Sequence, residues 1–312
     1  MATQPFPVVR HPTPALATLA DTLAWVGRER AALDAQLLDV GAVLFRGFPI
    51  ASAEDFDAFS AAFGYGDFTY AESLSNAVRL NHTPRVFTAN EAPPHVEIHL
   101  HHEMAQTPVS PSRLFFYCHR AAASGGATPL CRSDRLLEAL AQEDPGFVEQ
   151  LSERGLRYTT VMPCDDDADS GQGRSWRSTL SVEDLSGAED RLRALGYDWQ
   201  WLDNGSLRAT TPRLPAVIER SDGRRVLYNQ LIAAWLGWPG VREDPARALS
   251  FGDGSPLPLP GLRRMAELAE RFTVDLAWQD GDVALVDNRL VMHGRRPYSG
   301  DRRRQVLVAL AA

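Results

Sequence analysis

The residues in this sequence that are best able to do chemistry are histidines followed two positions later by an acidic residue. There are two such pairs, His95 with Glu97 and His101 with Glu103. With eight histidines and 40 acidic residues in 312 positions, chance alone would give about one such pair. In a strand, side chains two positions apart point to the same face, so a pair of this kind can bind one metal ion. The surrounding sequence must therefore show which of the two pairs is the better candidate for binding a metal.

His101 and Glu103 follow the alternating apolar segment 96–100, which places them where a strand would run out into a pocket. His95 instead follows Ala92-Pro93-Pro94, a loop signal, and is expected to begin that strand. We expect Glu97 and His99 to lie on an exposed face or to support the ligands. His102 should point away from His101.

A facial iron(II) site needs two imidazoles and one carboxylate, and leaves positions open for a cosubstrate and dioxygen. The third ligand must come from a distant strand, and His293 stands just after the apolar segment 281–292. The arginine-rich segment 302–304 follows. The distal carboxylate of 2-oxoglutarate suits a guanidinium, which binds it through two parallel hydrogen bonds. The pattern favours a metal site made of His101, Glu103 and His293.

The elements that would position these residues are mostly short strands, unevenly spaced, which favours a sandwich or jelly roll over a parallel sheet. We predict an α+β fold with a mainly β core and flanking helices, in a single domain spanning 1–312, because no linker-like stretch divides the chain. Predicted strands are 41–48, 96–101, 113–119, 128–132, 156–162, 207–211, 216–219, 225–229, 283–287 and 305–309. Predicted helices are 14–38, 53–63 (with Ser52 as N-cap), 133–142, 182–195 and 260–272.

Composition excludes several other classes of protein. The chain is 44% hydrophobic and 23% charged, as in ordinary globular proteins. Its net charge of −8 and dispersed basic residues argue against a nucleic-acid partner. No stretch approaches the roughly 18 apolar residues of a membrane span, so we expect a soluble, cytoplasmic protein with no membrane association. The three cysteines are too few for a disulfide framework and are expected to be free thiols.

Several longer motifs resemble the taurine dioxygenase superfamily, and more narrowly its clavaminate synthase-like branch, in which the metal carboxylate is glutamate. The motifs lie, in order, at residues 101–106, 113–118, 125–129, 173–179, 251–254 and 287–298. The resemblance implies a distorted double-stranded β-helix, a cupin-like jelly roll with helices outside. It also implies that His101, Glu103 and His293 hold Fe(II), and that Thr128 hydrogen-bonds the 2-oxoglutarate carboxylate.

The resemblance places the cosubstrate arginine at Arg304, although Arg302 and Arg303 occupy the same segment. It implies hydroxylation of an unactivated C–H bond by O2 and 2-oxoglutarate, with release of succinate and CO2. The implied substrate is an amino acid or an amino-acid-derived small molecule, free or carrier-bound. The resemblance leaves open desaturation, epoxidation or cyclisation, and the oligomeric state.

Three further residues, Asn81, Arg177 and Asn229, stand at motif positions. Each is a candidate either for the substrate pocket or, equally, for stabilising a turn or a strand. The acidic run 165–169 is expected to be a solvated loop or part of a lid.

Two other functions compete with an oxygenase. A non-catalytic cupin-like binding protein would have an incomplete set of ligands, and a zinc hydrolase would need a general base beside a metal-bound water.

Overall fold

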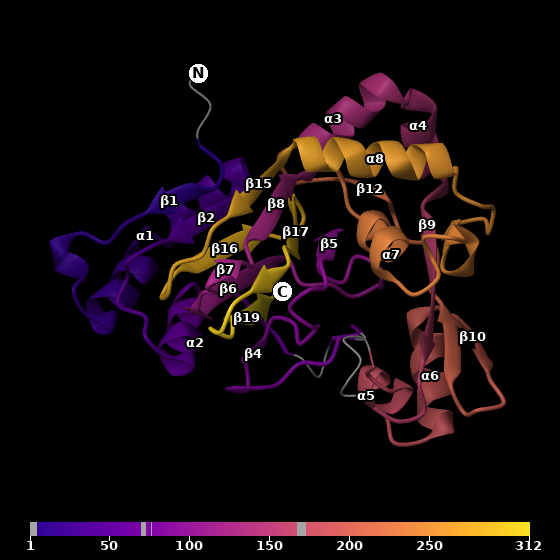
Figure 1. Ribbon diagram of the computed structural model, residues 1–312, viewed down its shortest axis with the longest axis horizontal. Coiled ribbons are helices and arrows are strands. Elements are labelled where there is room, and N and C mark those ends of the chain that lie inside the picture. Colours follow the sequence, from indigo (N-terminus) through magenta and orange to yellow (C-terminus); the bar gives the residue numbers. More distant parts are fainter. Residues whose placement is uncertain (1–4, 70–72, 76, 167–172) are drawn as a thin grey trace.

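The computed structural model describes residues 5–69, 73–75, 77–166 and 173–312, and its centre is a pair of β-sheets packed face to face (Figure 1). The larger sheet has the order β1-β2-β16-β6-β19-β3, with β4 also paired to β19. The smaller sheet has the order β15-β8-β17-β5. The strands of the larger sheet are β1 (Val8–Arg10), β2 (Ala42–Phe45), β3 (Asp67–Phe68), β4 (Val86–Thr88), β6 (Arg113–Arg120), β16 (Val283–Asp287) and β19 (Gln305–Ala311). Those of the smaller sheet are β5 (Ile98–His101), β8 (Thr128–Arg132), β15 (Thr273–Leu276) and β17 (Val291–Arg295).

The larger sheet is apolar on both faces because alternate residues of its central strands serve two different cores. On β6, Leu114 and Phe116 face the smaller sheet, whereas Phe115 and Tyr117 face the opposite side. Strand β19 divides its residues in the same way. Such a strand reads as a continuous hydrophobic run, since each face of the sheet is covered.

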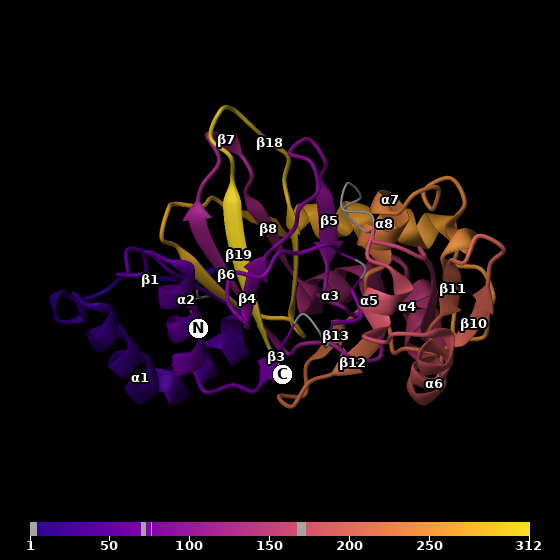
Figure 2. The same ribbon diagram turned by 90° about the horizontal axis from the view of Figure 1, so that it is seen from below.

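Helices cover the outer face of each sheet (Figures 1 and 2). The 3-10 turn η1 (Pro14–Leu16) precedes α1 (Leu19–Val40), and α1 packs with α2 (Ala53–Ala62) on the larger sheet. The smaller sheet is covered by α3 (Ser133–Glu143), α4 (Pro145–Arg154), α7 (Leu231–Gly237) and α8 (Leu259–Arg271). The predicted cap of α2 is present as a capping box, in which Ser52 and Asp55 each accept the other's main-chain N–H.

The middle of the chain forms an outlying unit, seen at the lower right of Figure 1. Its sheet has the order β10-β11-β9-β14, and helices α5 and α6 accompany it. The elements here are β9 (Leu156–Met162), α5 (Trp176–Leu180), α6 (Leu185–Leu195), β10 (Asp198–Trp201), β11 (Leu207–Thr210), η3 (Pro245–Arg247) and β14 (Leu249–Phe251). Two further two-stranded sheets are present, one formed by β12 (Val217–Glu219) with β13 (Arg225–Leu227), and one by β7 (Ser124–Gly125) with the distant β18 (Tyr298–Ser299).

The predicted fold class, an α+β jelly-roll core with helices outside, is confirmed, while several element boundaries differ. The first helix begins at Leu19 and not at Pro14, because the Thr18 side chain accepts the Asp21 N–H and caps it there. The predicted strand 96–101 begins only at Ile98. Helices α4, α5 and α7 were not predicted. Of the acidic run 165–169, residues 167–169 lie outside the described part of the chain. No helix in that part has the length and apolar content needed to cross a bilayer.

Candidate active site

Two neighbouring strands of the smaller sheet carry the predicted metal ligands. Strands β5 and β17 are antiparallel, and His101 is paired directly with His293 in their register. The two imidazole rings lie with their centroids 4.3 Å apart. Glu103 follows β5 by two residues, so its side chain reaches the same side as His101.

The side chains of His101, Glu103 and His293 converge closely enough to share one ion. Oε2 of Glu103 lies 3.7 Å from Nε2 of His101 and 3.6 Å from Nε2 of His293. One ligand atom from each of the three residues lies within 4.8 Å of the others. Two donors each about 2.1 Å from a common ion are at most about 4.2 Å apart. The Glu103 carboxylate therefore has the separation from each imidazole that a shared ion requires.

The protonation states of these groups also suit a divalent cation. The Nδ1 of His101 lies 2.8 Å from the carbonyl oxygen of His99, a hydrogen bond that orients the ring with Nε2 toward Glu103. Burial, with the charge of His101, lowers the pKa of His293 to about 4, so its imidazole is neutral at pH 7. Burial alone would raise the pKa of Glu103, but Arg79 and the two imidazoles hold that pKa well below its usual value. The site thus offers two imidazole nitrogens and one carboxylate oxygen.

The turn between β16 and β17 holds the main chain of Glu103 in place. The Oδ1 of Asn288 accepts the Glu103 N–H at 2.7 Å, and its Nδ2 donates to the carbonyl oxygens of Glu103 and Pro111 at 2.9 and 2.8 Å. His102 points away from His101, as predicted, and is fully buried between the Asn288 carbonyl and the Ser133 hydroxyl. These contacts connect the segment that carries Glu103 to the segment that leads to His293.

An inner cavity of about 60 Å³ brings together all five predicted site residues, His101, Glu103, Thr128, His293 and Arg304. The Thr128 hydroxyl accepts a hydrogen bond from Trp278 Nε1 at 3.0 Å, so its own proton is free to donate. The Nε of Arg304 donates to the carbonyl of Gly126 at 2.9 Å. A Cβ at Gly126 would lie 2.9 Å from Cδ of Arg304, and the φ of +71° is one that favours glycine.

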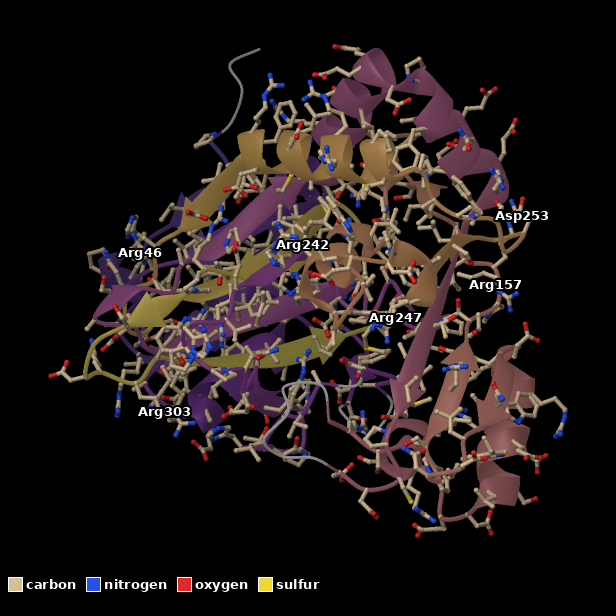
Figure 3. All side chains as sticks on the ribbon, turned by 45° about the vertical axis from the view of Figure 1, so that its right-hand side comes forward. Arg46, Arg157, Arg242, Arg247, Asp253 and Arg303 are labelled. Carbon is tan, nitrogen blue, oxygen red and sulfur yellow. The ribbon has the colours of Figure 1, made fainter. Side chains whose placement is uncertain are left out.

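The structure places the three arginines of the segment 302–304 in different surroundings. Burial and the nearby charge of Arg295 lower the pKa of Arg304 to about 10, as expected for a guanidinium held inside the protein. Arg302 pairs with Asp280 on the surface. Arg303 pairs with Glu91, has a side chain that is 78% exposed, and lies at the outer edge of the molecule (Figure 3). Of the three, Arg304 alone lines the inner cavity.

A larger outer cavity of about 320 Å³ adjoins the inner one. The two share His101, Glu103, Arg79, Asn90 and Ile98, so two of the three predicted metal ligands form part of the wall between them. The remaining lining is mixed. Its members include Leu74, Met162, Tyr197 and Trp238, the hydroxyls of Thr107, Thr160 and Thr211, the amide of Gln230, and the charged or titratable side chains of Glu97 and His99.

The expected substrate-pocket residues Asn81, Arg177 and Asn229 do not line either cavity, and this prediction is wrong. Asn81 is exposed, and the Arg177 guanidinium stacks over the Trp176 ring, 4.1 Å from its centroid. Asn229 is buried and uses its amide to bond the main chain at Ala216 and Leu231. The bond to Leu231 holds the first residue of α7.

Of the other His-x-Glu pair, Glu97 lies at the outer cavity, where its carboxylate pairs with Arg296 at 2.9 Å. His95 precedes β5 in a turn and takes no part in the cluster. Sequence reasoning missed Arg79 and Trp278, which contact Glu103 and Thr128. No motif or spacing marked either residue, because both reach the site from loops outside the ligand-bearing strands.

Comparisons with known proteins agree with this architecture. The family model for the taurine catabolism dioxygenase TauD, TfdA family matches residues 9–310. A clavaminate synthase-like protein of Arabidopsis thaliana is 40% identical over 307 residues, covering 96% of this chain and 92% of that protein. The dapdiamide synthesis protein DdaC of Enterobacter agglomerans is 28% identical over 282 residues, covering 86% and 82%.

Solved structures share the fold. The structure of an asparagine oxygenase in complex with Fe(II), 3-hydroxyasparagine and succinate matches with a TM-score of 0.59 at 13% identity, covering 97% of this chain and 93% of that one. The family match spans nearly the whole chain, and the Arabidopsis relative is 40% identical across 96% of it. The chain therefore belongs to the TauD, TfdA family and is an iron(II)- and 2-oxoglutarate-dependent dioxygenase.

Proposed function

We propose that His101, Glu103 and His293 hold the iron(II) of this enzyme, that Thr128 and Arg304 bind 2-oxoglutarate, and that the whole chain 1–312 acts as one dioxygenase domain. The observation that carries the proposal is the single inner cavity lined by all five residues. Two imidazole nitrogens and one carboxylate oxygen are the donor set of facial iron(II) sites. When bound, iron(II) and 2-oxoglutarate together supply the activation of dioxygen for oxidation of a C–H bond.

The chain's own residues bind and orient the reactants. Arg304 presents a partly buried guanidinium toward the inner cavity, where it can form charge-assisted hydrogen bonds with a distal carboxylate. Thr128 can donate its hydroxyl proton to a second carboxylate oxygen, because its bond with Trp278 uses only a lone pair of the hydroxyl oxygen. The apolar walls of Phe116 and Val306 exclude water from this cavity.

The substrate proposed for the outer cavity is an amino acid or an amino-acid-derived small molecule, hydroxylated at an unactivated C–H bond. The support comes from two sources. The similar proteins include an asparagine oxygenase and a dapdiamide synthesis protein. The cavity also combines apolar walls with hydroxyl, amide and carboxylate groups from Thr160, Gln230 and Glu97, which suit an ammonium or amide group.

The competing functions fit the site less well. A zinc hydrolase needs a base beside the metal-bound water, but among the described residues that line the inner cavity only Glu103 carries a carboxylate. A non-catalytic binding protein would have no need of a complete ligand set and a buried arginine in one cavity.

Anaerobic titration of the iron(II)-loaded protein with 2-oxoglutarate tests the proposal. We expect the weak visible absorption of the iron chelate, which a zinc site does not give. Loss of a charge-assisted bond costs about 1.5–3 kcal/mol, so Arg304→Lys should weaken 2-oxoglutarate binding about 10- to 100-fold. The matched variant Arg303→Lys should bind like the wild type, since Arg303 is exposed. No absorption, or equal effects of the two variants, would refute the assignment.

Substrate-stimulated release of succinate, measured across the free amino acids and their amides, tests the substrate class. We expect at least one of them to raise succinate release above the rate without substrate. Failure of the whole set, with taurine-like sulfonates active instead, would refute the amino-acid assignment and leave the metal site untouched.

A further inference from the structure

The two carboxylate oxygens of Glu103 have different neighbours. Oε2 faces the imidazoles of His101 and His293, at 3.7 and 3.6 Å. Oε1 instead accepts a hydrogen bond from Nη2 of Arg79 at 2.7 Å. Both members of this ion pair are buried, with side chains 6% and 8% exposed. One oxygen is therefore directed at the metal position, and the other is held by a guanidinium.

Arg79 reaches Glu103 from the loop that precedes β4, and it lines both the inner and the outer cavity. Its guanidinium carbon lies 5.3 Å from the centroid of the Phe87 ring. Within the described part of the chain, Glu103 is the carboxylate that pairs with it, and its Nε has no hydrogen-bond partner. A buried guanidinium held by one carboxylate and one ring has few alternative positions, so it can fix the orientation of that carboxylate.

The orientation matters because a carboxylate binds a metal through one oxygen or through both. Three protein donors leave about three positions of an octahedral ion for a bidentate cosubstrate and dioxygen. A carboxylate bound through both oxygens would take one of these positions. A donor fixed on Oε1 prevents this, provided that it stays on the carboxylate when the metal binds.

We propose that Arg79 is a positioning residue that restricts Glu103 to metal binding through Oε2 alone and so keeps a coordination position open. The inference rests on the proposed function, since it takes His101, Glu103 and His293 to be the metal ligands. Metal affinity by itself is a poor measure of this role, because the positive charge of Arg79 also repels the ion. The number of waters on the metal is the direct measure.

The experiment uses Mn(II) alone as the probe and counts its exchangeable waters from the relaxation rate of water protons. The wild type should carry about three waters and Arg79→Met about two, because the released Oε1 then binds as well. Arg79→Lys keeps a charged donor and should restore about three. Arg85→Met is the matched control, since Arg85 lies on the same segment and pairs with Asp57 and Asp67 instead. It should match the wild type.

The outcomes separate the two proposals. If the wild type fails to bind Mn(II), or binds it equally well after Glu103→Ala, the metal site itself is wrong. If binding is intact but the wild type carries two waters, or Arg79→Met carries three or four, the role of Arg79 is overturned. Circular dichroism checks the fold of each variant. Should Arg79→Met be unfolded, Arg79→Gln takes its place, because its shorter, uncharged side chain cannot form the ion pair with Glu103. About two waters are then expected, and three or more would overturn the proposal.

Discussion

Replacing Asn288 by alanine should weaken both the fold and the metal site. Its side chain forms three buried hydrogen bonds, to the main-chain N–H and carbonyl of Glu103 and to the carbonyl of Pro111. Asn288 is fully buried, so water cannot replace them. A buried polar group left without its partner costs about 1–3 kcal/mol. We expect Asn288→Ala to lower the free energy of unfolding by about 3–5 kcal/mol.

The expected change in melting temperature follows from the size of the chain. Unfolding entropies of about 2.1 cal/mol/K per residue, over 312 residues, mean that 1 kcal/mol shifts Tm by about 1.5 °C. Asn288→Ala should therefore lower the Tm of the metal-free protein by about 5–8 °C. Residues that orient metal ligands typically contribute about 10- to 100-fold in affinity. The affinity for Mn(II) should fall by that factor, because Glu103 is no longer held relative to His293.

Thermal denaturation followed by circular dichroism and calorimetric titration with Mn(II) measure the two effects. Asn204→Ala is the control, since Asn204 is exposed and its side chain only accepts the Ser206 N–H at 3.1 Å. It should shift Tm by less than about 1 °C and leave Mn(II) affinity unchanged. If Asn288→Ala kept its Tm within 2 °C of the wild type, or bound Mn(II) equally well, the role of Asn288 in holding Glu103 would be refuted.

Four further outcomes are expected. Gly126→Ala should weaken 2-oxoglutarate binding at least tenfold, measured from the visible chelate absorption, because the new Cβ would lie 2.9 Å from Cδ of Arg304 and displace it; unchanged binding would contradict this geometry. Burial raises the pKa values of Cys118 and Cys131 to about 12, so at pH 8 a thiol reagent should label only Cys164 in the native protein and all three thiols after unfolding. Because of these two raised pKa values, the thiols lose their protons at a lower pH in the unfolded chain than in the folded one. The free energy of unfolding should therefore fall as pH rises from about 8.5 toward 12. Denaturant titrations that gave a larger free energy of unfolding at pH 10 than at pH 8 would contradict this prediction. Finally, Mn(II) at 100 times its dissociation constant should stabilise the fold by about 2.7 kcal/mol, and chelation should reverse the gain.

Much of the framework was predictable from the sequence, because strand alternation is a local property of the chain. The runs that became β6, β16 and β19 are continuous and apolar, as strands covered on both faces must be. Boundaries were less well predicted. The start of α1 depends on one threonine cap at Thr18, and the short helix α7 has too few turns to show a periodic pattern.

The residue types that could form the site can be read from the sequence: a His-x-Glu pair at a strand end, a distant histidine, a threonine after a glycine pair, and an arginine-rich segment. Only the folded structure shows which of these side chains lie together and which are buried. The register of β5 against β17 places His101 beside His293, and packing buries Arg304 while leaving Arg303 in solvent. It also brought Arg79 to Glu103 from a loop without any motif. The physical reason is that strand pairing and burial join segments nearly two hundred positions apart, and no local pattern records which side chain will meet which.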